Sequence, residues 1–274
     1  MDSVLKWTIN LRIWLAADRL ITEVADDLYI IRALILRNLR VQHAKNPLGI
    51  FVEFLRPIAV CIVHYFYFTV TRRPVPAHQY AAFTIGGFAI YFAFITAFSG
   101  TFESAKWPDG ATNIPGVTRM HVRLARVVWA YLLYVAFAVA IVVPVRLLGL
   151  TLNIPNIPLT LEMFGLATAL GFGYGLVTSA IGIMFPALVP FLKVSQWAVF
   201  ITSGVYDSLV TMPAVLAVYI WYNPIIHLAE MQRYAYSPGY PIYLVSLSYA
   251  MCWVVGLILL GLMMNRALCN KKSH

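Results

Sequence analysis

Repeated apolar segments, each long enough to cross a bilayer as a helix, constrain this chain more than any other feature. A spanning helix needs about 20 mostly apolar residues. Five segments meet this length readily, at residues 48–70, 80–102, 124–149, 163–185 and 243–264. A sixth segment, at 188–208, is weaker because Pro190 and Lys193 lie near its start. The sequence therefore predicts an all-α integral membrane protein with six transmembrane helices, in a domain at residues 48–264.

The composition also indicates a chain that folds in a lipid bilayer. Hydrophobic residues make up 61% of the 274 residues and charged residues only 11%, against about 25% charged residues in soluble domains. A net charge of +9 would favour nucleic acid in a soluble protein, but here the Lys and Arg residues lie between apolar runs. We therefore expect no nucleic-acid partner. Cys61 and Cys252 lie inside apolar runs and Cys269 in the basic tail, so no disulfide framework is expected.

The distribution of Lys and Arg predicts the orientation. With the N-terminus inside, the cytoplasmic segments are 1–47, 103–123, 186–193 and the tail 265–274, and they hold fourteen Lys and Arg residues. The outer segments hold three. Cytoplasmic loops carry the excess of positive charge in membrane proteins. Both termini are therefore expected in the cytoplasm.

The segment before the last span does not fit a seventh crossing. Residues 209–222 are apolar but too few to span. A seventh span would also place the basic tail outside. We therefore expect re-entrant helices at the outer face, within residues 209–242.

The first 47 residues are predicted to form a cytoplasmic amphipathic interface segment. Basic side chains lie opposite an apolar stripe, as in helices that rest on anionic headgroups. The alternative, a helix packed on another protein subunit, stays open, and both can hold. The stripe contains Leu28, Ile31, Ile35 and Leu39, and the basic residues opposite it are Arg32, Arg37 and Arg40.

No enzyme motif is present in the sequence. There is no GxxxxGK[ST] loop, and no Lys follows a Gly; HExxH, CxxC and GxSxG are also absent. We expect no catalytic residue, metal site or cofactor in this chain. An ATPase, if one is used, must be a separate chain that binds ATP and Mg²⁺.

Ionisable residues inside the spans are few. Glu53 and Arg56 lie three apart near the cytoplasmic start of the first span and can pair on one helix face. No acidic residue lies near the middle of any span, which argues against an ion- or proton-coupled carrier.

Aromatic side chains suggest a path for sugars, because the C–H faces of sugar rings pack on aromatic planes. Phe88, Tyr91 and Phe98 share one face of the second span, and Tyr65 and Phe68 lie together in the first. The alternative is a lipid-facing belt or helix packing. The glycine-rich fourth span favours close helix packing over a flexible gate.

Two stretches carry a resemblance to a known family. Residues 32–60, RALILRNLRVQHAKNPLGIFVEFLRPIAV, run from basic residues through Pro-Leu-Gly to an apolar segment with Arg-Pro in its first turns. Residues 203–241, SGVYDSLVTMPAVLAVYIWYNPIIHLAEMQRYAYSPGYP, precede the last span. With the six-span layout, these stretches resemble ABC-2-type exporter permeases, closest to the inner-membrane permeases of capsular polysaccharide export.

The resemblance implies a homodimeric permease with two ATPase subunits in the bacterial inner membrane. Its substrate would be a lipid-linked polysaccharide; whether a periplasmic adaptor takes part stays open. The loop 103–123 would carry a coupling helix that contacts the ATPase, with Trp107, Arg119 and Arg123 as its candidate residues. This loop departs from the capsule pattern, because Met120-His121-Val122 stands where an acidic residue often follows the Arg.

The resemblance also implies that the outer segment, residues 209–242, lies where the glycan leaves the permease. Asn223, His227, Glu230 and Arg233 would contact sugar hydroxyls or acidic groups there. Alternatively they cap the short helices, and the spacing of Asn223, His227 and Glu230 lets these side chains bond one another. An ABC-2 permease for another cargo, such as O-antigen, teichoic acid or a small drug, remains the alternative function. A membrane-embedded enzyme or assembly factor would need catalytic clusters, and the sequence shows none.

Overall fold

The computed structural model describes residues 22–41, 49–71, 80–104, 114–147, 149, 156–237 and 239–271. These residues form helices joined by turns, with no strand among them, which confirms the all-α class. Four helices are long and apolar enough to cross a membrane: Tyr80–Glu103, Arg119–Leu147, Ile157–Met184 and Leu247–Leu268. Two further apolar helices, Leu55–Thr71 and Pro186–Ile201, are shorter. Each of the six predicted segments thus contains a helix, and four of those helices have the length and hydropathy of a span.

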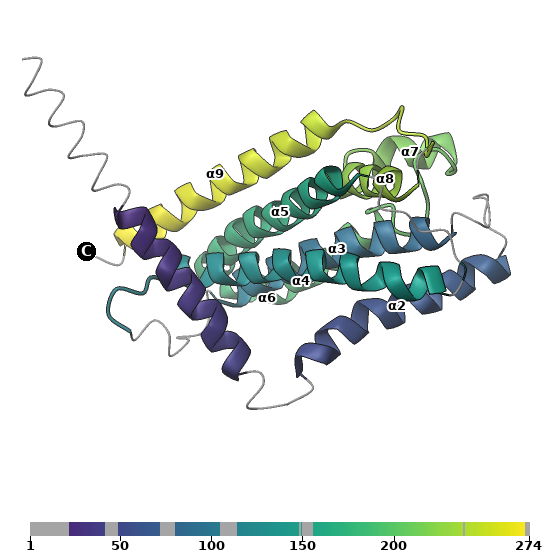
Figure 1. Ribbon diagram of the computed structural model, residues 1–274. Coiled ribbons are helices and arrows are strands. Elements are labelled where there is room, and N and C mark those ends of the chain that lie inside the picture. The colour runs from purple at the N-terminus through teal and green to yellow at the C-terminus, as the bar shows by residue number, and fades with distance from the viewer. Residues whose placement is uncertain are drawn as a thin grey trace, which may run out of the picture.

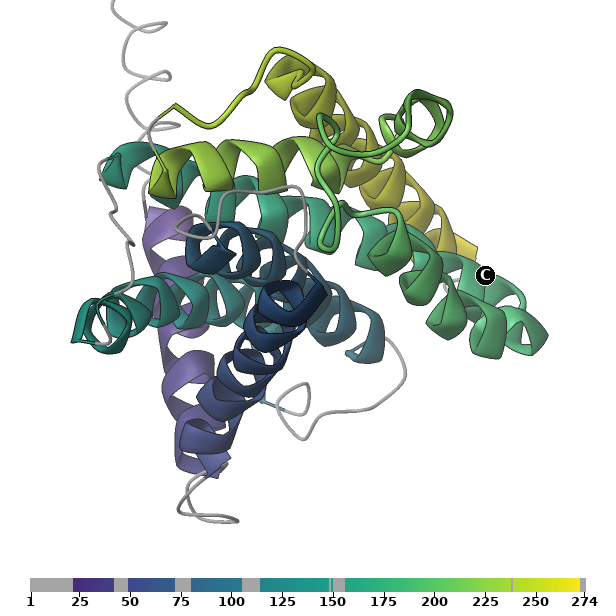
Figure 2. The same cartoon turned by 90° about the vertical axis from the view of Figure 1, so that its right-hand side faces the viewer.

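Figure 1 shows most of the helices running side by side along one axis. Helix 22–41 lies at one end of this bundle, and α7 and α8 lie at the other (Figure 1). Figure 2 shows α8 running across the bundle, next to α3. In chain order the elements after helix 22–41 are α2 (Gly49–Thr71), α3 (Tyr80–Glu103), α4 (Arg119–Leu147), α5 (Ile157–Met184), η2 (Pro186–Leu188), α6 (Val189–Ile201), α7 (Ala214–Ile220), α8 (Pro224–Tyr236) and α9 (Leu247–Lys271).

Two long helices begin earlier than the hydropathy pattern predicts, because polar side chains cap them. α4 starts at Arg119, inside the segment 103–123 that was expected to be a loop, and the Thr118 hydroxyl accepts a hydrogen bond from the His121 amide at 3.3 Å. α5 starts at Ile157, where the Asn156 side chain accepts from the Leu159 amide at 3.0 Å. Side-chain caps of this kind satisfy amides that have no partner inside the helix.

Glycines bring α5 against both of its neighbours. A Cβ at Gly171 would collide with the Phe94 carbonyl of α3, and one at Gly173 would lie 2.9 Å from Leu257 of α9. A Cβ at Gly175 would lie only 2.7 Å from the Thr101 side chain. Small residues let helix backbones approach this closely. The glycines of the fourth predicted span therefore have a packing role, which the sequence favoured.

Helix 22–41 packs its apolar face on the first turns of α4. Leu34, Val122 and Ala125 form a small buried cluster there. The Asp27 carboxylate lies 2.9 Å from His121 Nε2. Part of the apolar stripe of this helix is therefore covered by the same chain, whereas other apolar side chains of the helix, among them Leu28, Tyr29 and Leu36, are exposed.

Candidate functional site

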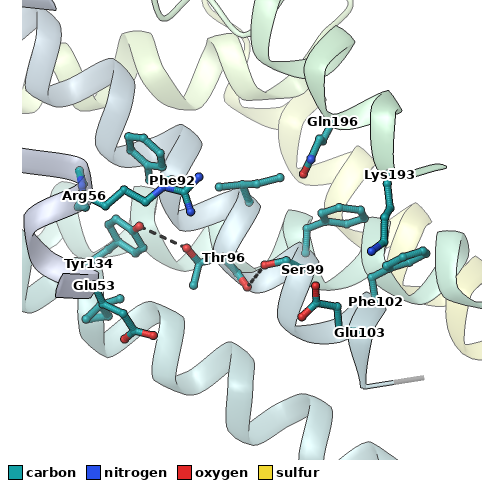
Figure 3. Close-up of a pocket in the computed structure, with 14 residues that line it drawn as sticks. Glu53, Arg56, Phe92, Thr96, Ser99, Phe102, Glu103, Tyr134, Lys193 and Gln196 are labelled. Carbon is teal, nitrogen blue, oxygen red and sulfur yellow. Dashed lines mark hydrogen bonds between the residues drawn. The ribbon is translucent and has the colours of Figure 1, made fainter. Parts of the chain in front are cut away.

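A polar cavity opens between α2, α3, α4 and α6, and we call it the central cavity. Its volume is about 450 Å³, within the usual range of about 300–1,000 Å³ for small-molecule sites. Figure 3 shows charged, hydroxyl and aromatic side chains on its walls. The fourteen lining residues are Glu53, Arg56, Pro57, Phe92, Ile95, Thr96, Phe98, Ser99, Phe102, Glu103, Leu133, Tyr134, Lys193 and Gln196.

The charged groups of the central cavity come from three helices. Glu53 and Arg56 belong to α2, Glu103 ends α3, and Lys193 lies on α6. The Arg56 guanidinium carbon lies 6.0 Å from the centroid of the Phe92 ring, a cation–π distance. The sequence identified Glu53 and Arg56 as neighbours on one helix. It did not identify Glu103 and Lys193 as members of the same cavity, since only the folding of α3 beside α6 brings them there.

Hydroxyl groups form a second part of the lining. The Thr96 hydroxyl and the Tyr134 hydroxyl lie 3.3 Å apart, and the Ser99 hydroxyl donates to the Thr96 carbonyl at 3.3 Å (Figure 3). Each hydroxyl can both donate and accept. Together with the charged groups and the aromatic rings, they suit a ligand with many hydroxyls on apolar rings.

Most of the aromatic residues proposed for a substrate path pack inside the bundle instead of facing this cavity. Phe88 is fully buried against His64 and Tyr206, and the centroid of its ring lies 4.3 Å from the centroid of the His64 ring. Tyr91 is 7% exposed, and its hydroxyl donates to the Gln196 carbonyl at 3.2 Å. Phe68, 1% exposed, belongs to a second cluster, and Tyr65 packs at its edge. These contacts match the alternative of helix packing.

Phe98 does line the central cavity, together with two residues that the sequence analysis did not single out. Phe92 and Phe102 lie on the same cavity wall. The rings of Phe98 and Phe102 are stacked, 5.6 Å apart with planes at 24°. The spacing of Phe98 and Phe102, four residues apart, was a signal that could have found this pair, since such residues share one face of a helix.

The predicted exit residues lie on α8 and at its start, and Arg233 is the largest of their fully buried side chains. Its side chain is fully buried. Nη1 donates to Glu230 at 2.9 Å, Nε to the Phe83 carbonyl at 3.2 Å, and Nη2 to the carbonyls of Gly204 at 2.6 Å and Val205 at 3.2 Å. The guanidinium also lies 3.6 Å from the centroid of the Phe83 ring. Arg233 thus joins α8, α3 and the segment after α6.

Glu230 completes this buried network, which we call the Arg233 network. Its carboxylate accepts from the Ser208 hydroxyl at 3.0 Å and from the Leu209 amide at 3.3 Å. Gly204 has a φ of +69°, a conformation that favours glycine. A buried charge is tolerated only when it is paired and hydrogen-bonded. Glu230 and Arg233 therefore tie residues 204–209 to α8.

Asn223, His227 and Glu230 do not bond one another in the described residues, so that expectation was wrong. The Asn223 side chain caps α8 by accepting from Ile225, and its amide donates to the Thr202 hydroxyl at 2.8 Å. His227 contacts Trp221 and Ser246 instead. Each side chain therefore contacts a different segment: Asn223 contacts the end of α6, His227 contacts Trp221 and Ser246, and Glu230 contacts residues 208–209.

The protonation of His227 follows from its two partners. The Ser246 amide donates to Nδ1 at 3.2 Å, so the proton is on Nε2, which lies 2.9 Å from the Trp221 carbonyl. Burial lowers the pKa of His227, and the bond to the Trp221 carbonyl opposes this shift in part. The imidazole is therefore neutral at neutral pH.

The candidate ATPase-coupling residues separate in the structure. Trp107 lies outside the described residues. Arg119 is exposed in the first turn of α4. Arg123 is only 4% exposed and donates to Asn265 of α9 at 2.9 Å and to Ser179 of α5 at 3.4 Å. Arg123 therefore ties three helices together, and Arg119 is the one of the two that a partner can reach.

Two known proteins are similar to this chain in sequence. No family model matches the chain. A polysialic acid transport protein KpsM of Escherichia coli is 25% identical over 237 residues, which cover 86% of this chain and 92% of that protein. A second protein of the same name and organism is 26% identical over 241 residues, with the same coverage. The chain is thus similar over most of its length to permeases of the ABC-2 type that export capsular polysaccharide, which confirms the resemblance drawn from its motifs.

Proposed function

We propose that this chain is the membrane permease of an ATP-driven exporter that moves a lipid-linked polysaccharide from the cytoplasm across the inner membrane. The observation that carries the proposal is the central cavity in a chain that is similar in sequence, over most of its length, to polysialic acid transport proteins. Its aromatic rings and hydroxyl groups suit sugars, and its charged groups need a polar occupant at membrane depth.

The substrate path we propose runs along the central cavity and not through the cluster around Phe88. Phe98 and Phe102 supply the aromatic wall, and Thr96 and Ser99 supply hydroxyl groups. Arg56 and Lys193 are exposed side chains on the facing helices. A glycan that slides past these groups would exchange one set of hydrogen bonds for another, which favours movement over tight binding.

We further propose that a second copy of the chain closes the cavity. The outer faces of α2 and α6 expose large apolar side chains, including Val63 and Phe66 on α2 and Phe191 and Trp197 on α6. Lipid can cover such faces, but lipid tails cannot solvate Arg56 and Lys193 beside them. A homodimer contact along α2 and α6 would place two sets of these charges around one path.

The energy for export would come from a separate ATPase. The sequence contains no phosphate-binding loop, and no span carries a central carboxylate that ion coupling would use. The end of the bundle where α3 stops and α4 begins would face the cytoplasm, in agreement with the distribution of Lys and Arg. The segment around Trp107 and Arg119 would contact the ATPase, which binds ATP and Mg²⁺.

The test is transport of a lipid-linked glycan into proteoliposomes that contain the chain and its co-expressed ATPase. The double substitution Arg56→Ala and Lys193→Ala should lower ATP-dependent transport, because both side chains face the cavity and neither is needed for packing. Met263→Ala, at an exposed position of α9 away from the α2 and α6 faces, is the control. Equal transport by the double variant and the wild type would contradict the path, and transport without any ATPase or ATP would contradict the exporter itself.

A further inference from the structure

Helix α6 supplies one wall of the central cavity but has no fully buried side chain that would hold it to the bundle. None of its 13 residues is buried, and large apolar side chains on it, including Phe191 and Trp197, are exposed. It nevertheless contributes Lys193 and Gln196 to the cavity lining. Figure 3 shows these two side chains across the cavity from α3. The width of the central cavity therefore depends on what holds α6 in place.

The last turn of α6 is fixed by packing and by one amide. Val199 and Phe200 pack against the main core cluster. The Asn223 side-chain amide, at the start of α8, donates to the Val199 carbonyl at 3.1 Å. These contacts lie beyond Lys193 and Gln196 along the helix. The cavity-lining part of α6 therefore needs contacts of its own.

Two tyrosine hydroxyls from two different helices supply those contacts. The Tyr174 hydroxyl of α5 lies 2.8 Å from the Ser195 hydroxyl. Ser195 donates its own proton to the Leu192 carbonyl at 2.7 Å, so Tyr174 is the donor in this pair. The Tyr91 hydroxyl of α3 donates to the Gln196 carbonyl at 3.2 Å. The two bonds therefore reach α6 at adjacent residues beside the cavity.

The ring of Tyr174 also contacts the aromatic wall of the same cavity. Its centroid lies 5.2 Å from that of Phe98, which lines the cavity, and 5.9 Å from that of Phe94. Tyr174 thus contacts the aromatic wall through its ring and α6 through its hydroxyl. Because the ring is rigid, the hydroxyl lies at a fixed distance from the ring face, and this distance helps to set the separation of the two walls. A phenylalanine at this position would keep the first contact and lose the second.

We propose that Tyr174 is a positioning residue that, together with Tyr91, sets the width of the central cavity by holding α6 at a fixed distance from the aromatic wall. The proposal rests on the central cavity as the path of the glycan. Without these bonds α6 would spend part of its time farther from Phe98, and Lys193 and Gln196 would move with it. The hydroxyl bonds thus let a glycan touch both walls at once, and they limit how bulky a passing sugar can be.

The test measures the width with a cysteine in place of Ile95, a cavity-lining residue, in the full-length chain without native cysteines. In lipid nanodiscs this cysteine is labelled by methyl methanethiosulfonate and by a methanethiosulfonate that carries a glucose unit. Tyr174→Phe should raise the rate with the glucose reagent about fivefold, as expected for the loss of one hydrogen bond worth roughly 1 kcal/mol. The rate with the small reagent should not change. An unchanged rate with the glucose reagent would overturn the proposal.

Further variants assign the effect to the bonds themselves. Ser195→Ala should also raise the rate with the glucose reagent, and combining it with Tyr174→Phe should add nothing, because both remove the same bond. Increases that multiply in the double variant would contradict that bond. Tyr91→Phe should add to the effect of Tyr174→Phe, and no added increase would contradict the part of Tyr91. Tyr219→Phe, at an exposed position of α7, is the control and should label like the parent chain.

Transport separates positioning from a general loss of activity. In proteoliposomes with the ATPase, Tyr174→Phe should raise the half-saturating concentration of the lipid-linked glycan more than it lowers the maximal rate, because α6 carries part of the surface that the glycan contacts. A lower maximal rate at an unchanged half-saturating concentration would contradict the positioning role. Labelling needs neither the glycan nor the ATPase. A parent chain that labels as expected but exports nothing would therefore count against the proposed function alone.

Discussion

At the scale of single residues, Arg233 shows how one side chain organises a segment far from it in sequence. A guanidinium presents five N–H groups in a rigid plane, and here it reaches one carboxylate and three carbonyls. A lysine ammonium has three donors on one atom and cannot span the same positions. The Arg233 network therefore depends on the shape of the side chain as much as on its charge.

Arg233→Lys should accordingly destabilise the protein by roughly 3–5 kcal/mol, the cost typical of breaking a buried charged pair. Thermal unfolding in detergent, followed by size-exclusion chromatography, would measure the loss. Arg119→Lys, at an exposed position, is the control and should unfold like the wild type. Unfolding of Arg233→Lys at the wild-type temperature would show that the network does not stabilise the fold.

The burial of His227 predicts that the folded protein loses stability in acid. Burial lowers the pKa of His227 in the folded protein below the ordinary value of about 6.5. The unfolded chain therefore binds a proton that the folded chain resists, and stability falls as the pH drops below about 6.5. His227→Gln should reduce the pH dependence of the unfolding temperature between about pH 7 and 5, whatever its stability at neutral pH. The same slope in the variant and the wild type would refute this role.

The sequence indicated the polar residues of α8 as a group but not their partners. Asn223, His227, Glu230 and Arg233 stand out because they are polar between two apolar stretches. Their partners come from elsewhere: Phe83 is 150 positions from Arg233, and Ser208 is 22 from Glu230. Only the crossing of α8 over α3 brings these groups together, and no local pattern specifies that crossing.

At the scale of elements, the backbone contact of α5 with α3 limits what can replace its glycines. Gly171→Ala would push a methyl group against the Phe94 carbonyl, which cannot move without shifting α3. We expect a loss of roughly 1–3 kcal/mol, typical of an overpacked core. Gly256→Ala on α9 meets open space and serves as the control, with no loss expected. Both unfolding temperatures can be measured in one detergent, and equal values would contradict the close packing.

Helix positions were predictable from length and hydropathy, whereas helix ends and partners were not. The extra turns at the start of α4 contain Arg119 and Arg123, which the average hydropathy assigns to a loop. Arg123 is nevertheless helical and buried, and Asn265 and Ser179 accept hydrogen bonds from its two terminal guanidinium nitrogens. That compensation comes from α9 and α5, so it cannot be derived from the local sequence.

At the scale of the whole molecule, the distribution of Lys and Arg predicts opposite sides for two loops. Single cysteines at Ala77 and Thr112, in a chain without native cysteines, should react with a membrane-impermeant maleimide from opposite faces of intact spheroplasts. Ala77 should react from outside, and Thr112 only after the membrane is opened. External labelling of both positions would reject the orientation with two cytoplasmic termini.

The last prediction concerns the contact with an ATPase, because substitutions of Arg119 and Arg123 in the first turns of α4 should have different effects. Arg119 is exposed, so Arg119→Glu should weaken ATPase binding about fivefold, as expected for a contact worth about 1 kcal/mol, and leave unfolding unchanged. Arg123 is buried against α5 and α9, so Arg123→Ala should lower the unfolding temperature, with any loss of ATPase binding following from that. Pull-down of the co-expressed ATPase and thermal unfolding of each variant separate these effects. If Arg119→Glu binds the ATPase as tightly as the wild type, the contact must lie elsewhere on the cytoplasmic surface, with the segment around Trp107 as the next position to test.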